Sequence, residues 1–171
     1  MDFNTQQNRE FLIANFPKLG SDTNFKVNSP CTGVYNCIAF AMGLTDRWVD
    51  TFSAPGHWWP PIAERSESKE SLIKAFEYMG YEICDAADIE DGYEKVVLFC
   101  KDDSWTHAAK IIANGVEHSK FGIGWDAIHS GNHIFQGSSY GDEYAYMKRK
   151  VSNRDFFINR SSGIGRIRII A

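Results

Sequence analysis

The hydrophobic periodicity of this chain changes once, at about Gly80, and that change limits the folds open to it. Before Gly80 the apolar residues follow helical spacing, most clearly in SKESLIKAFEYMG. After Gly80, short apolar runs such as YEIC and EKVVLFC have the length and composition of strands. Helices followed by strands favour an α+β fold, in which the helices pack on an antiparallel sheet.

Local signals place the individual elements. Helices are expected over residues 9–16, 35–42 and 69–79, stopped by Pro17, Gly43 and Gly80 respectively. Strands are expected over 81–84 and 94–100, followed by a hairpin over 105–122 with its turn at Asn114-Gly115. Residues 20–30 and 125–143 are rich in turn-forming residues and are predicted to be loops, and 144–151 is a candidate for closing the sheet.

Length and composition indicate one soluble domain. A chain of 171 residues with 43% hydrophobic residues can build a single core, which we place in residues 1–150. Residues 151–171 form a C-terminal extension that the pattern leaves unassigned. The formal net charge of -4 argues against nucleic acid as a partner. The absence of both a long apolar run and a secretory signal predicts no membrane partner and a cytoplasmic location with reduced thiols.

Cys37 is the candidate nucleophile. A free cysteine in an apolar helix usually packs as a small core residue. Cys37, however, falls in the first turn of its predicted helix, where unpaired N–H groups and the helix dipole favour a thiolate. Cys84 and Cys100 lie in predicted strands, where we expect them to be unpaired and buried, and Cys31 lies in a loop.

His107, at the start of a predicted strand, is the candidate base for this thiol. A base needs a third group to hold its second ring nitrogen, and three residues qualify. His118 shares a face with His107 if the hairpin turn has two residues, whereas Ser119 does so if the loop has one more. Asp126 becomes the candidate if the segment after the hairpin folds back.

The aromatic loop GHWWPP offers Trp58 and Trp59 as a wall of a substrate cleft, as a partner surface or simply as a packed corner. The chain has neither Cys-x-x-Cys nor His-Glu-x-x-His, so neither a metal nor an organic cofactor is expected.

A cysteine at a helix start, a histidine on a later strand and a polar residue on the next strand resemble the papain-like cysteine hydrolases, and most closely their bacterial cell-wall amidase and peptidase branch. More specifically, the phrases NCIAFA, HWWPP, THAAK and SKFG, within residues 35–149, resemble a bacterial family of that topology. The resemblance implies Cys37 as nucleophile, His107 as base and His118 as the third member. The position six residues before the nucleophile, where papain carries an oxyanion-binding Gln, is Cys31. The oxyanion donor is then the Cys37 N–H or the Asn36 side chain.

These observations predict a papain-like domain that hydrolyses an amide bond in a peptide, a protein or another amide-containing substrate. The alternative is a non-catalytic interaction module whose Trp-rich loop meets a protein partner.

Overall fold

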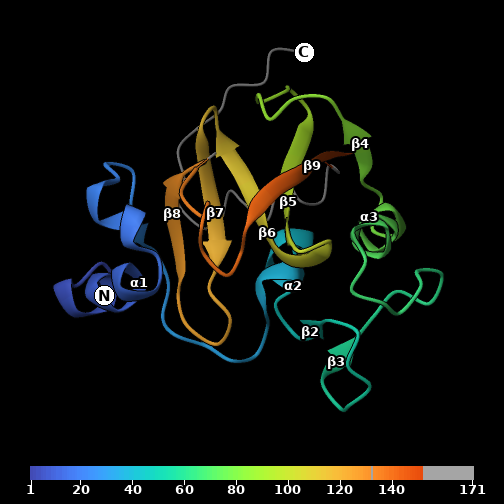
Figure 1. Ribbon diagram of the computed structural model, residues 1–171, viewed down its shortest axis with the longest axis horizontal. Helices are drawn as coiled ribbons and strands as arrows, with labels where there is room; N and C mark the ends of the chain where they lie inside the picture. Colours follow the sequence, from blue (N-terminus) through green and yellow to red (C-terminus); the bar gives the residue numbers. More distant parts are fainter. Residues whose placement is uncertain (132, 152–171) are drawn as a thin grey trace.

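A seven-stranded antiparallel sheet is the centre of the fold, in the computed structural model that describes residues 1–131 and 133–151 (Figure 1). Its strands follow the order β1-β8-β7-β6-β5-β9-β4. Their bounds are β1 Lys26–Val27, β4 Glu82–Cys84, β5 Tyr93–Lys101, β6 Ser104–Ala113, β7 Val116–Lys120, β8 Asp126–Ser130 and β9 Asp142–Lys150. Two further short strands, β2 (Trp48–Val49) and β3 (His57–Trp58), pair in parallel away from the sheet. The predicted α+β class with an antiparallel sheet is confirmed.

Helix caps explain why the predicted helices begin and end where they do. In α1 (Gln6–Asn15) the N-cap is Thr5, and in α3 (Lys69–Tyr78) it is Ser68, whose side chain accepts a hydrogen bond from Ser71 N. The short helix α2 (Cys37–Met42) is capped by Asn36 and ends at Gly43. Gly43 has a φ of 84°, a left-handed conformation that glycine adopts at little cost. A 3-10 turn, η1 (Pro17–Ser21), follows α1.

The strand predictions were confirmed over the apolar runs and wrong over two predicted loops. The hairpin β6–β7 turns at Asn114-Gly115, and β9 lies between β5 and β4 as an interior strand. Both β1 and β8 lie in segments predicted to be loops. They pair with each other, with Lys26 opposite Ile128, across about a hundred residues of sequence. Local composition therefore could not predict these strands. Of the predicted extension 151–171, residues 152–171 lie outside the described residues.

Two apolar clusters lie on the two faces of the sheet. The helices α2 and α3 pack on one face, where Ile38, Leu72 and Phe76 meet Val96, Leu98, Ala108 and Met147 of the strands. On the other face α1, η1 and the 134–140 segment pack against the sheet through Leu12, Phe16, Leu19, Ile134 and Phe135. Figure 1 shows α1 and α3 at opposite ends of the sheet and α2 near its middle. Within this arrangement α2 lies against β6 and β7.

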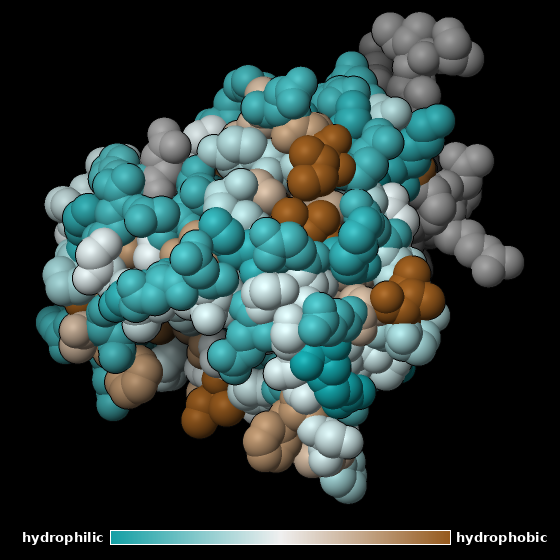
Figure 2. All heavy atoms as spheres, turned by 45° about the vertical axis from the view of Figure 1, so that its right-hand side comes forward, coloured by the Kyte–Doolittle hydropathy of each residue, from teal (hydrophilic) through white to brown (hydrophobic). Residues whose placement is uncertain are grey.

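Polar side chains dominate the face of the molecule shown in Figure 2, where the apolar side chains of the described residues form separate spots. Exposed apolar residues include Phe52, Ile62 and Ile83. In the described part of the chain, no helix has the length and apolar character needed to cross a membrane.

Candidate functional site

Cys37 is the first residue of α2, and its thiol is surrounded by backbone N–H groups. The N–H groups of Cys37, Ile38 and Ala108 all interact with the sulfur and favour its thiolate. The first two are free for this role because the N-terminal N–H groups of a helix have no partner within the helix. The side chain of Asn36 caps Ala39 N at 3.0 Å, and so leaves Cys37 and Ile38 N–H to the thiol.

Burial outweighs these groups and raises the pKa of the Cys37 thiol to about 11, although the three N–H groups and the charge of Lys120 lower it. The side chain is only 9% exposed. A thiolate removed from water loses its hydration, which a short helix does not replace. The expected low-pKa thiol is therefore wrong for this conformation, because Cys37 is protonated at neutral pH.

His107 is fully buried on β6, between aromatic rings. Its imidazole stacks on Tyr140 with ring centroids 4.0 Å apart and an angle of 6° between the planes. Phe99 and Phe135 pack against the same ring at 5.4 and 5.3 Å. Burial, together with the nearby His129, lowers the pKa of His107 well below its usual value, so the ring is neutral at pH 7.

The two nitrogens of His107 have different surroundings. Nε2 lies 2.9 Å from Ser119 Oγ, whereas Nδ1 has no hydrogen-bond partner among the described residues. A buried polar atom without a partner is uncommon in proteins, so this nitrogen calls for an explanation.

The Cys37 thiol and the His107 ring lie at neighbouring positions of β6 but on opposite faces of the sheet. Cys37 packs in the cluster of α2 with Ala108, whereas the His107 ring packs in the other cluster, against Phe99, Phe135 and Tyr140. The N–H that faces the Cys37 sulfur belongs to Ala108, the residue directly after His107. Tyr140, which stacks on His107, also senses this thiol, because the charge of a Cys37 thiolate adds to burial in raising the pKa of the phenol. Among the described residues no hydrogen bond joins the Cys37 sulfur to either ring nitrogen of His107.

The side chain that meets His107 is Ser119, and not His118 as preferred from the sequence. The hairpin pairs Ala113 with Val116 but Ile111 with Glu117, so Ile112 is an extra residue in β6. This bulge shifts the register by one position and pairs His118 with Lys110. Ser119 consequently takes the face of His107 although the turn has two residues, because the extra residue lies in β6 and not in the loop.

His118 instead turns toward α2 and binds Asp126. Its Nε2 lies 2.5 Å from Asp126 Oδ1, and its ring packs edge-on against Phe40 at 4.9 Å. Burial would raise the pKa of Asp126, but hydrogen bonds from His118 and Ser29 outweigh it and lower that pKa. Asp126 is therefore the partner of His118 and not of His107, so both lie outside the hydrogen-bond chain of the candidate base.

Ser119 connects His107 to a second buried histidine. Its Oγ lies 2.8 Å from His129 Nε2, and His129 Nδ1 lies 2.8 Å from the backbone oxygen of Ser130. Burial lowers the pKa of His129 to about 4. Because residues 125–143 were predicted to be a loop, the sequence did not indicate that His129 lies on a strand, β8, next to Ser119.

Lys120 is a buried cation beside the thiol. Its Nζ donates to the backbone oxygens of Thr32 and Gly122 and lies 5.3 Å from the Tyr35 ring centroid. Burial lowers its pKa, while the charges of Cys31, Asp126 and Cys37 raise it. Its sequence context was typical of a solvated strand residue, so only the tertiary structure identifies it as part of the site.

The predicted substrate-binding residues Asn36 and Trp59 are structural. The Asn36 amide is buried; its Oδ1 accepts from Val49 N and its Nδ2 donates to Val49 O, which ties α2 to β2. Trp59 is buried, stacks on Trp105 and donates to backbone oxygens, as the packed-corner interpretation predicts. Trp58 is half-buried and packs against the first cluster.

All four cysteines are free, as predicted. Cys84 and Cys100 are only half-buried, because each lies at or next to the end of its strand, so their predicted full burial is wrong. Cys31, which takes the place expected for an oxyanion-binding side chain, is exposed, and its sulfur donates to Ile123 O at 3.1 Å.

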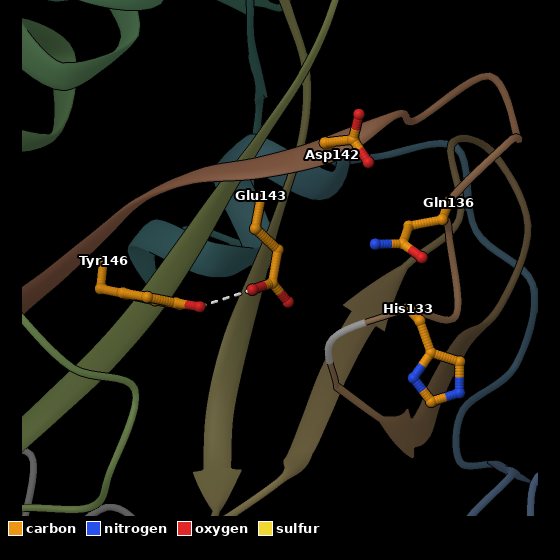
Figure 3. Close-up of a pocket in the computed structure, with 5 residues that line it drawn as sticks. All are labelled: His133, Gln136, Asp142, Glu143 and Tyr146. Atoms are coloured by element: carbon orange, nitrogen blue, oxygen red, sulfur yellow. Dashed lines mark hydrogen bonds between the residues drawn. The ribbon is translucent and has the colours of Figure 1, made fainter.

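A separate polar hollow of about 400 Å³ lies beside the start of β9. Figure 3 shows Glu143 and Tyr146 next to each other on β9, with His133 and Gln136 on a neighbouring turn. Tyr146 Oη donates to Glu143 at 2.6 Å, which raises the pKa of Tyr146 to about 12. No group of three or more potential metal ligands occurs among residues 1–131 and 133–151.

Comparison with known families identifies the family of this chain but gives no activity. A family model described as a domain of unknown function (DUF7689) matches residues 26–148. The chain belongs to this family. The match covers every residue of the candidate site, from Cys37 to Tyr140. Searches of curated proteins and of solved structures found no match.

Proposed function

We propose that this protein is a papain-like thiol hydrolase that cleaves an amide bond, with Cys37 as nucleophile, His107 as base and Ser119 as the residue that holds the base. The substrate is a peptide, a protein or another amide-containing molecule. Four free cysteines fit action in the reducing cytoplasm.

The observation that carries this proposal is the unpartnered Nδ1 of His107. This nitrogen is buried, yet no described residue binds it, and it belongs to the residue just before the N–H that faces the Cys37 thiol. A neutral imidazole with an available lone pair can accept the proton of a thiol, and the two groups lie at neighbouring positions of β6.

The reaction follows from these positions. His107 Nδ1 takes the thiol proton as the Cys37 sulfur bonds to the amide carbon, and the carbonyl electron pair moves to oxygen. The N–H groups of Cys37 and Ile38 stabilise the oxyanion. Collapse of this intermediate expels the amine, which takes the proton from His107. Water then attacks the thioester, with His107 accepting the proton of water and returning it to the leaving thiol.

The pair is neutral at rest, since burial raises the pKa of Cys37 and lowers that of His107. Proton transfer therefore accompanies attack on a bound carbonyl. A suitable probe is an electrophile that needs the thiol proton, such as a nitrile, whose carbon takes the sulfur and whose nitrogen takes the proton to form a thioimidate.

The test uses N-acetylglycine nitrile labelled with ¹³C at the nitrile carbon and follows the thioimidate resonance by NMR. We expect a single thioimidate in the wild type and none in Cys37→Ala. In His107→Asn the thioimidate should form about 10² times more slowly, or not at all. The comparison variant is His118→Asn, which changes the histidine that faces α2 from the adjacent strand and is expected to keep the wild-type rate. A wild-type protein whose Cys37 stays unmodified, or equal rates in His107→Asn and wild type, would overturn the proposal.

A further inference from the structure

A line of hydrogen bonds runs through the buried interior from His107 to the backbone of β8. His107 Nε2 and His129 Nε2 approach the same Ser119 hydroxyl at 2.9 and 2.8 Å. His129 Nδ1 then meets the backbone oxygen of Ser130 at 2.8 Å. Both imidazoles and the serine are fully buried, so water does not compete for these bonds.

The Ser130 carbonyl determines where the protons of this line reside. A carbonyl oxygen only accepts, so His129 Nδ1 must carry a hydrogen. Since the ring is neutral, His129 Nε2 is then bare and accepts the Ser119 hydroxyl hydrogen. The Ser119 oxygen has no further hydrogen to donate, so it accepts from Nε2–H of His107. Nδ1 of His107 is thereby left without a hydrogen.

We propose that His129 is a positioning residue that sets the tautomer of His107 through the Ser119 hydroxyl. This inference rests on the proposed function, because it gives His107 Nδ1 the bare lone pair that a base for Cys37 requires.

Contacts around the line hold each member in place. The carboxylate of Asp22 accepts from Ser130 N and from Ser130 Oγ, both at 2.7 Å, and so anchors the residue whose carbonyl begins the line. Phe135 packs edge-on against both His107 and His129. The line therefore ends on a backbone group of an interior strand that is itself fixed by a side chain.

The test is the ¹⁵N NMR spectrum of histidine-labelled protein, in which the two ring nitrogens distinguish the tautomers. His107→Gln identifies the His107 signals by their loss. We expect His107 in the wild type to be the Nε2–H tautomer. His129→Phe keeps a ring between the neighbouring aromatic residues but removes the acceptor, so Ser119 turns its hydrogen to His107. His107 then becomes the Nδ1–H tautomer. His129→Gln, whose amide oxygen can accept from Ser119, restores the wild-type tautomer.

Two results would overturn the inference: a wild-type His107 with its hydrogen on Nδ1, or a His129→Phe protein whose His107 tautomer is unchanged. The wild-type measurement needs no variant and so stands even if His129→Phe fails to fold. His118→Phe, a control on the neighbouring strand, is expected to leave His107 unchanged.

The nitrile probe separates this inference from the proposed function. Thioimidate formation is expected to slow by about 10² in His129→Phe and to recover in His129→Gln. If the wild type forms no thioimidate while the tautomers behave as stated, the hydrolase proposal fails and the tautomer assignment stands.

Discussion

Ser119→Ala removes one buried oxygen atom and takes the hydrogen-bond partner from two ring nitrogens, His107 Nε2 and His129 Nε2. Leaving a buried donor or acceptor without a partner costs about 1–3 kcal/mol, so the two together lower the free energy of unfolding by about 2–6 kcal/mol. The effect is measured by urea unfolding followed by circular dichroism. With a slope of about 2 kcal/mol per M, the midpoint falls by about 1–3 M.

The matched control is Ser53→Ala, at an exposed loop position, which is expected to change the free energy of unfolding by less than about 0.5 kcal/mol. A double-mutant cycle sharpens the test, because in a His129→Phe background only the His107 nitrogen loses a partner. The cost of Ser119→Ala should then fall by about 1 kcal/mol or more. A cost below about 0.5 kcal/mol in the wild-type background, or one that His129→Phe leaves unchanged, would refute the shared hydroxyl.

Three further predictions concern pH, charge and capping. Because burial lowers the pKa of His107 and His129, the unfolded chain binds more protons than the folded one below pH 6.5. The free energy of unfolding in urea should therefore fall from pH 6.5 toward pH 4, by up to about 1.4 kcal/mol per pH unit for each histidine. A flat profile would contradict the neutrality of the two rings. Lys120→Met removes a charge that lowers the pKa of Cys37. The rate of Cys37 alkylation, measured by peptide mapping, should then reach half its maximum at a pH above 11. If that pH is the same as in the wild type, Lys120 does not affect the pKa of Cys37. Asn36→Ala removes the N-cap of α2 and both hydrogen bonds to Val49, so the free energy of unfolding should drop by about 2–4 kcal/mol. A drop of less than about 1 kcal/mol would contradict the structural role of Asn36.

The helices were predictable because their signals are local. Gly43 ends α2, as the sequence indicates, and Ser68, one of two serines that could cap α3, caps it. The Asn114-Gly115 turn was predictable for the same reason, since two residues with a strong turn preference suffice to place it. The strands β1 and β8 were missed because they are stabilised by pairing with distant segments and not by their own composition.

The same difference between local signals and long-range pairing applies to the candidate site. A helix-start cysteine and a strand histidine were recognisable as residue types in suitable positions, so Cys37 and His107 could be named in advance. Choosing between His118 and Ser119 required the register of β6 against β7, which a one-residue bulge at Ile112 changes. Such a bulge exchanges the two faces of the strand, so neighbouring residues exchange roles.

By itself, the sequence determined the three helices, the strands over the apolar runs, the ends of α2 and α3, the hairpin turn and the two residue types on which the proposed chemistry depends. Only the tertiary structure decided that Ser119 and not His118 meets His107, that His129 lies behind it and that Lys120 is buried beside the thiol. The physical reason is the separation in sequence between the residues that interact. Caps and turns are set by hydrogen bonds between residues a few positions apart, whereas burial and strand register depend on segments brought together only when the sheet forms.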